Sequence, residues 1–185
     1  MIRTIGKLAR FGRDRRGVSA VEFALVAPVM VALYLGCVEL SDGIAVDRKV
    51  SLTAAALANL VSEVTGPGSP PSLSTGDMTN VFNAASAIIQ PYSAGNMKMT
   101  VSCLSVDANK NVTTKWTATS NGGVGGTASV PADLTVANTQ LILAQVSYAY
   151  KPIVGYTISG TLTLSDKMYM MPRMTAPTYN SNSCT

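Results

Sequence analysis

The chain has 185 residues, a formal net charge of +4 and no histidine. This length is enough for one membrane helix and one small domain. Six of the fourteen Lys and Arg residues lie within residues 1–17 beside a single acid, so the remainder carries a net charge of −1. The basic balance therefore belongs to a targeting segment and predicts no nucleic-acid partner.

The first predicted element is a membrane-spanning helix over residues 18–38. Its only strongly polar residues are Ser19 and Glu22. At 1.5 Å per residue such a helix is about 31 Å long, which matches the hydrocarbon core of a bilayer. Because the residues before it are basic, the positive-inside rule leaves the N-terminus in the cytoplasm. We expect a single-pass anchor with the following domain on the other side of the membrane.

The start of this helix differs from a plain anchor. Gly17 separates the basic leader (residues 1–17) from the apolar run, Glu22 lies inside that run, and Phe23 follows it. A basic leader that ends in Gly, before a helix with Glu at its fifth residue, resembles the class III signal peptide of type IV pilins and pseudopilins. More narrowly, the run Gly17–Pro28 (GVSAVEFALVAP) resembles the opening of TadE-like proteins, the TadE/TadF-type minor pseudopilins of the tight-adherence (Tad, Flp-type) pilus.

The resemblance implies a processing site and an assembly role. Prepilin peptidase would cleave after Gly17 and leave Val18 as the new N-terminus. Glu22, with Phe23 beside it, would then neutralise the ammonium of its own chain or of a neighbour, which would fix the axial register of a docking subunit because an unpaired charge in hydrocarbon is costly. The implied location is the bacterial inner membrane with a periplasmic head. The implied partners are prepilin peptidase, other pilins or pseudopilins, inner-membrane Tad assembly components and the lipid bilayer.

Several alternatives explain the same residues. Glu22 could belong to a plain anchor and reach back to interfacial water. The chain would then be an unprocessed, membrane-anchored periplasmic binding or adhesin module that keeps residues 1–17. A secreted protein with an ordinary signal peptide is a second rival, because Gly43-Ile44-Ala45 offers a weak cleavage site. A membrane-anchored hydrolase without histidine is a third.

Helical spacing continues past the membrane span. Pro28 lies within the span, where we expect a kink and not a break, and the TadE-like pattern also carries Ala-Pro at this point. Residues 39–65 form the predicted periplasmic extension, with Gly43 as a possible hinge. Its predicted buried stripe comprises Leu40, Ile44, Val50, Ala54, Leu57, Val61 and Val64. The Gly- and Pro-rich residues 66–71 end the helix.

Residues 74–185 form the predicted head. A second helix, capped by Asp77 or a nearby Ser or Thr, buries Met78, Val81, Phe82, Ala85, Ile88 and Ile89 and closes at Pro91. The period then changes to two, which predicts strands over residues 97–106, 112–118, 141–150, 162–164 and 167–171. The fold class is therefore α+β and pilin-like: a long N-terminal helix, a second helix and an antiparallel sheet of about four strands.

Two side chains of the predicted sheet carry specific expectations. Trp116 is expected in the core, on the same strand face as Val112 and Thr114. Cys103 and Cys184 fall in the exported head, where an oxidising periplasm favours a disulfide over two free thiols. Cys37 lies within the span and is expected to be an inert apolar residue.

The chain offers little for catalysis. Without histidine it lacks the usual base for a serine or cysteine nucleophile, and its ten acids are scattered singly. No zinc or calcium spacing occurs, and the Gly-rich residues 120–127 lack the Lys-Ser/Thr ending of a phosphate loop. We expect an exposed loop there, with a contact at the tip as one alternative. We therefore predict no catalytic residue, no metal, no cofactor and no enzyme.

The resemblance extends loosely toward the C-terminus. The segments Val146–Pro152 and Tyr169–Arg173 resemble the C-terminal half of TadE-like proteins, although Met171 stands where Arg is expected. The methionines over residues 168–174 are adaptable packing groups that could line a subunit contact.

Overall fold

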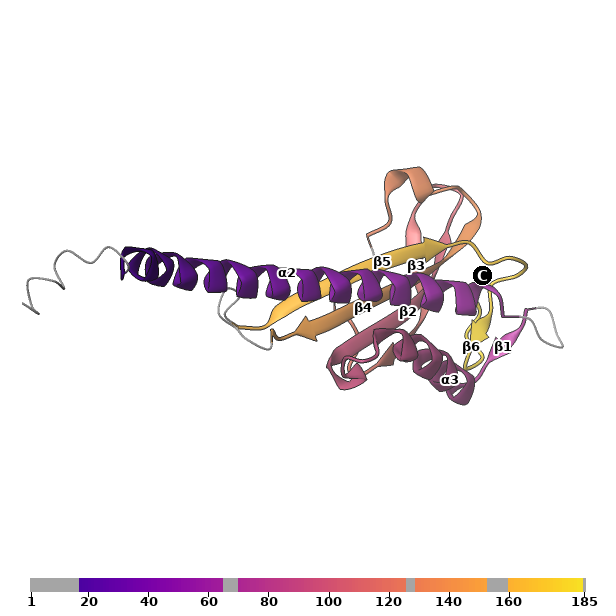
Figure 1. Ribbon diagram of the computed structural model, residues 1–185. Coiled ribbons are helices and arrows are strands. Elements are labelled where there is room, and N and C mark those ends of the chain that lie inside the picture. The colour runs from indigo at the N-terminus through magenta and orange to yellow at the C-terminus, as the bar shows by residue number, and fades with distance from the viewer. Residues whose placement is uncertain (1–16, 65–69, 126–128, 153–159, 185) are drawn as a thin grey trace, which may run out of the picture.

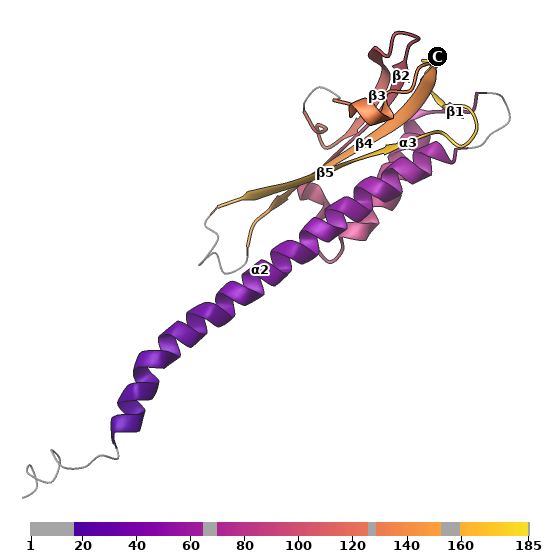
Figure 2. The same cartoon turned by 90° about the horizontal axis from the view of Figure 1, so that it is seen from above.

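The computed structural model describes residues 17–64, 70–125, 129–152 and 160–184. The predicted leader before Gly17, most of the predicted helix-ending segment at residues 66–71 and the end of the Gly-rich loop lie outside the described residues. One long helix lies across one face of an antiparallel sheet and extends far beyond it, with its N-terminal part standing alone (Figures 1 and 2). The α+β prediction is confirmed.

Helix α2 (Val18–Ser62) is the longest element, with 45 residues. It passes through Pro28 without a break, and Figure 2 shows its path curving toward the N-terminal end. None of the residues from 18 to 38 is buried. From residue 39 onward one face is buried, by Glu39, Val46, Val50, Thr53, Ala54, Leu57, Ala58, Val61 and Ser62.

The first turns of this buried face differ from the sequence prediction. Leu40 and Ile44 are exposed, and Glu39 and Val46 are buried in their place. Residues seven apart return to nearly the same side of a helix, so Glu39 and Val46 share the face that Val50 and Leu57 continue. The helix also runs through Gly43 without a hinge, and a Cβ at that position would lie 3.9 Å from Cε1 of Tyr150.

Helix α3 (Thr75–Ser86) packs beside α2 on the same core. Its N-cap is Ser74, whose hydroxyl accepts from the backbone N–H of Asp77 at 3.2 Å, while the Asp77 carboxylate accepts from the backbone N–H of Ser74 at 3.0 Å. This capping box satisfies two N–H groups that have no helical partner. A 3-10 turn (Ala87–Ile89) follows α3.

Four strands form the sheet, in the order β3-β2-β4-β5. Their bounds are β2 Met97–Val106, β3 Val112–Ser120, β4 Thr139–Tyr150 and β5 Leu162–Met170. All neighbouring strands are antiparallel. The two C-terminal segments predicted separately form the single strand β5. One face of β4 packs toward α2, as its alternation predicts, through Ile142, Ala144, Val146, Tyr148 and Tyr150.

The expectation that Trp116 shares a face with Val112 and Thr114 is wrong. Cys103 pairs with Trp116, but its neighbour Leu104 pairs with Thr114, so the register shifts by one residue at Lys115. A bulge of this kind exchanges the faces of all later side chains. Trp116 therefore lies in the main core, to which α2 and α3 also contribute, whereas Val112 packs on the opposite face of the sheet.

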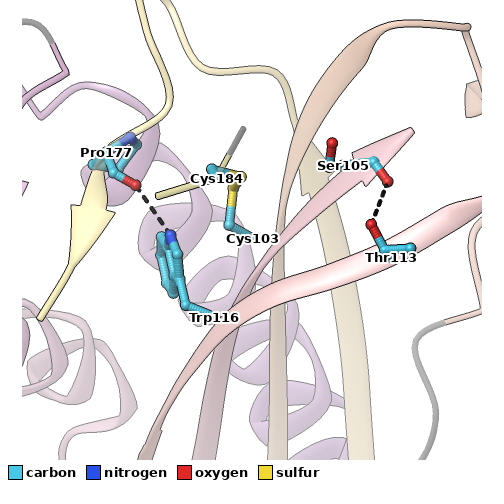
Figure 3. Close-up of a disulfide and its surroundings, with 6 residues drawn as sticks. All are labelled: Cys103, Ser105, Thr113, Trp116, Pro177 and Cys184. Atoms are coloured by element: carbon cyan, nitrogen blue, oxygen red, sulfur yellow. Dashed lines mark hydrogen bonds between the residues drawn. A yellow bond between two sulfur atoms is a disulfide. The ribbon is translucent and has the colours of Figure 1, made fainter. Parts of the chain in front are cut away.

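The end of the chain closes the head. We call residues 171–184 the C-terminal strap. Within it, β6 (Thr178–Tyr179) pairs in parallel with β1 (Ser72–Leu73), and Cys184 forms a disulfide with Cys103 of β2, with the two Cα atoms 5.9 Å apart. Figure 3 shows the disulfide beside Trp116, whose indole N–H donates to the carbonyl of Pro177 at 3.0 Å.

Candidate functional site: the exposed half of α2

The N-terminal half of α2 carries apolar side chains on all sides, and none of them is buried by the part of the chain that the structure describes. Phe23 and Leu25, for example, are 69% and 72% exposed. An 18-residue window of this helix has a mean hydropathy of 2.1 and no buried residue. Large apolar surfaces of this kind are stable in lipid or against other apolar helices. The helix is long and apolar enough for a single-pass membrane anchor.

The predicted processing site lies where this helix begins. Gly17 directly precedes the first residue of α2 and is exposed. A Cβ built on Gly17 would have no atom within 4 Å other than those of its immediate neighbours. Val18 is half exposed and opens the first turn. The backbone on both sides of the Gly17–Val18 bond is therefore free of packing from the head.

Glu22 is exposed one turn along from Val18. Residues four apart lie on one helix face, about 6 Å apart along the axis, so the Glu22 carboxylate and the Val18 backbone nitrogen lie on the same side. No Lys or Arg occurs between Gly17 and Arg48, and Arg48 is roughly 39 Å further along the helix. Within α2, the Val18 amine that cleavage would create is the cation within reach of Glu22.

The membrane-type surface ends at Glu39. This residue is 3% exposed and interacts within the fold, although it lies one residue after the predicted span. Sequence analysis missed it because an acid next to a span is usually assigned to the water phase. Its only signal is its spacing of seven residues from Val46, which places both on one helix face.

Tyr150 packs against α2 at the same level. Its ring lies at Gly43, and burial raises the pKa of its phenol, with the carboxylates of Asp42 and Glu39 and the rings of Tyr92 and Tyr148 adding to the rise. The head therefore contacts α2 within about one to two turns of residue 38, the end of the predicted span. No spacer separates the two halves of the helix.

Lys49 joins the same part of α2 to the 3-10 turn that follows α3. The ammonium of Lys49 donates to the carbonyl of Ile88 at 3.2 Å and to the carbonyl of Gln90, and it lies 6.0 Å from the centre of the Tyr92 ring. Cations at the carboxyl end of a helical segment neutralise its exposed carbonyl groups. The membrane-proximal part of the head is thus fixed to α2 from two sides.

The head carries no cluster of metal-binding side chains among the residues that the structure describes. No group of three or more His, Cys, Asp or Glu side chains lies close enough there to hold a metal ion. A surface pocket of about 350 Å³ lies between the start of the Gly-rich loop and strands β4 and β5, lined by Val124, Gly125, Gln145, Val146, Ser165, Asp166 and Lys167.

A comparison with protein families decides what the exposed half of α2 belongs to. Residues 17–58 match the family model of TadE-like proteins. This segment is TadE-like. The match begins at Gly17, spans the whole exposed half and ends within the buried half, and it supports a general association with the Tad pilus. No curated protein and no solved structure matches the chain.

Proposed function

We propose that this chain is a minor pseudopilin or assembly factor of a Tad-type pilus, without enzymatic activity. Residues 18–38 of α2 span the bacterial inner membrane, the N-terminus faces the cytoplasm and the head lies in the periplasm. The observation that carries this proposal is the abrupt change at Glu39: before it α2 is exposed and apolar on all sides, and after it one face is buried on the sheet.

The proposal includes processing by prepilin peptidase between Gly17 and Val18. Exposure of this bond, without packing from the head, supports it. Cleavage removes the basic leader and creates an ammonium on Val18 at a helix N-terminus. The Gly17–Val18 bond would lie at the cytoplasmic edge of the span, which is the side of the membrane from which the peptidase would act.

Glu22 is then the residue through which subunits find their register. A carboxylate inside a membrane segment costs roughly 2.5–3.5 kcal/mol near the helix centre and less toward the interface. Pairing with an ammonium from Val18 of the same chain or of a neighbouring pilin or pseudopilin removes that cost. Once the leader with Arg15 and Arg16 is removed, α2 offers no base near Glu22, and the Val18 ammonium is the cation of the same chain closest to it in sequence.

The ordinary signal-peptide alternative would place cleavage near Gly43-Ile44-Ala45. These residues lie inside α2, and cleavage there would detach Glu39 and the turn against which Tyr150 packs. Signal peptidase would thus remove part of the core of the head. We therefore retain the pseudopilin proposal and leave the unprocessed periplasmic module as its rival.

The first experiment measures the N-terminus of the membrane-extracted protein by intact mass, in cells with and without prepilin peptidase. The proposal expects a start at Val18 that requires the peptidase. A Gly17→Val variant, which leaves the span and the head intact, should remain at full length. A start at Met1 in both strains would favour the unprocessed anchored module.

Glu22 is tested by incorporation into the pilus assembly. Glu22→Ala should reduce incorporation, and Glu22→Asp, which keeps the charge, should retain more of it. Ser19→Ala, a change of the other polar residue in the span, is the matched control and should incorporate normally. Unchanged incorporation of Glu22→Ala at equal protein level would contradict the register role.

A further inference from the structure

The C-terminal strap connects parts of the head that are far apart in sequence. Near its start, the Arg173 backbone N–H donates to the Ser62 carbonyl at 3.1 Å, at the end of α2. Further on, Thr178 N–H donates to the Pro71 carbonyl at 2.9 Å and Asn180 N–H to the Leu73 carbonyl at 3.1 Å. These bonds belong to a two-residue strand pair and to turns, so they can open locally without disturbing the four-stranded sheet.

The strap also covers the only tryptophan. Pro177 accepts from the indole N–H of Trp116, and the Tyr179 ring lies 5.6 Å from the Trp116 ring, centre to centre. Trp116 is 4% exposed in this arrangement. Undocking of the strap would expose the indole, which makes Trp116 a built-in reporter of strap docking.

The two cysteines of the disulfide occupy unequal places. Cys103 lies within β2, which is hydrogen-bonded to β3 on one side and to β4 on the other. Cys184 lies near the end of the strap. Both side chains are fully buried in the docked state, so a protein-sized oxidant can reach neither. Oxidation must therefore happen while the strap is undocked, and undocking frees Cys184 at a far smaller cost than opening the sheet around Cys103.

We propose that this chain is a substrate of a thiol–disulfide oxidoreductase, with Cys184 as the entry cysteine and Cys103 as the resolving cysteine. The inference rests on the proposed topology, in which the head lies in an oxidising compartment. In the first step the Cys184 thiolate, having lost its proton to water, attacks the disulfide of the oxidoreductase. A mixed disulfide forms, and the second sulfur of the oxidoreductase leaves as a thiolate and takes up a proton.

Docking of the strap completes the reaction. The Cys103 thiolate, its proton also released, attacks Sγ of Cys184, and the oxidoreductase leaves as a thiolate that is protonated in turn. In total the two thiols of the chain lose two electrons and two protons, and the oxidoreductase disulfide becomes a dithiol. Since Cys184 is fully buried in the docked strap, the attached enzyme cannot remain once Trp116 and Tyr179 meet. Docking therefore favours release of the enzyme.

The test traps the mixed disulfide in cells that make the oxidoreductase. Cys103→Ser removes the resolving thiol, so a disulfide-linked adduct of the chain with the oxidoreductase should accumulate and be visible by non-reducing electrophoresis and mass spectrometry. Cys184→Ser should give little adduct, and Cys37→Ser, the control in the span, should behave as the unchanged chain. Equal adduct from both head variants, or more from Cys184→Ser, would overturn the proposal.

A second measurement avoids variants that fail to fold. The reduced, unchanged full chain in detergent is treated with a bulky maleimide while Trp116 emission is recorded. Cys184 should react at least about tenfold faster than Cys103, because local opening requires less free energy than opening of the sheet. Equal rates would contradict the assigned order.

A membrane-impermeant maleimide applied to intact spheroplasts of an oxidase-deficient strain separates the two possible failures. Labelling of Cys184 in intact spheroplasts supports a periplasmic head. If the Cys103→Ser and Cys184→Ser variants then gave equal amounts of adduct, only the order of the two cysteines would be overturned. Absence of labelling, with labelling after lysis, would overturn the topology and the inference together.

Discussion

The two halves of α2 have the same backbone geometry but different surroundings. Residues 18–38 bury nothing within the chain, whereas residues 39–62 bury one face against the sheet and α3. A helix that is apolar all round needs lipid or partner helices, while a helix with one apolar stripe folds against a sheet. The change occurs at Glu39 without a hinge, so one continuous helix joins the exposed half to the head. The predictions below test this division, beginning with the largest expected effect.

Truncating a leucine should destabilise the head only in the second half of α2. Leu57 is fully buried, and Leu57→Ala should lower the free energy of unfolding of the head by about 2–5 kcal/mol, through lost burial and a cavity. Leu33 is 65% exposed, and Leu33→Ala should leave this free energy unchanged. Denaturation in detergent, followed by Trp116 fluorescence, measures both. Equal losses would mean that the first half of α2 also packs on the head.

The two acids of α2 should separate folding from assembly. Glu39 is buried and interacts within the fold, so Glu39→Ala should lower the free energy of unfolding by about 1–3 kcal/mol because the interaction of this buried carboxylate is lost. Glu22→Ala should leave folding of the head unchanged and reduce incorporation into the pilus assembly. Unfolding curves and incorporation assays on both variants, at equal protein level, measure the separation. A loss of folding stability from Glu22→Ala would contradict it.

The capping box of α3 should matter to the head alone. Ser74→Ala should lower the free energy of unfolding by about 0.5–2 kcal/mol, because the first turn of α3 loses its hydroxyl acceptor. Thermal unfolding of the extracted protein, with membrane insertion measured in parallel, checks this. Unchanged unfolding would contradict the role of the cap.

The stabilisation that the Ser74–Asp77 capping box provides should depend on pH. The hydrogen bonds from Ser74 hold the pKa of the Asp77 carboxyl below its ordinary value of 3.8. A lowered pKa in the folded state means that the stabilisation is present above the ordinary pKa and is lost as the pH falls through the folded pKa. The difference between the unchanged chain and Ser74→Ala should therefore shrink as the pH falls below about 4.

The surface contact at the far end of α2 should matter least. Arg173 forms an ion pair with Glu63, and its guanidinium also donates to Asn59, but the Arg173 side chain remains 64% exposed and the Glu63 side chain 37% exposed. Exposed pairs of this kind contribute about 0–1 kcal/mol. Glu63→Gln should change the unfolding midpoint only slightly, and less in high salt. A large loss would show that the start of the strap depends on this pair.

Sequence periodicity predicted most helices and strands of the fold, but it did not always predict which face of each element is buried. The strands over residues 97–106 and 141–150 coincide closely with β2 and β4, because alternation over ten residues is a strong local signal. The bulge at Lys115 carries no such signal, so periodicity correctly puts Trp116 in the core but wrongly puts it on the same strand face as Val112 and Thr114. Likewise Leu40 and Ile44 satisfy helical spacing, and only the position of the sheet decides that Glu39 is buried in their place.

The candidate site divides in the same way. Its chemical groups, from Gly17 to Glu22, are adjacent in sequence and were found without the structure. The strap could not be found in this way, because β1 and β6 are two residues each and their pairing joins positions more than a hundred residues apart. A strand of two residues is too short to show a recognisable alternation of apolar and polar side chains, so it cannot be predicted from the sequence.

The sequence by itself determined the apolar segment at residues 18–38, its basic flank, the resemblance at Gly17–Pro28 and the periods of the main helices and strands. These features follow from composition and from spacing over a few turns, which a single segment carries alone. Only the tertiary structure decided where α2 leaves the head, which faces are buried and that the strap closes over Trp116. Those outcomes depend on contacts between segments that are distant in sequence. Such contacts override local propensity, and no pattern within one segment reveals them.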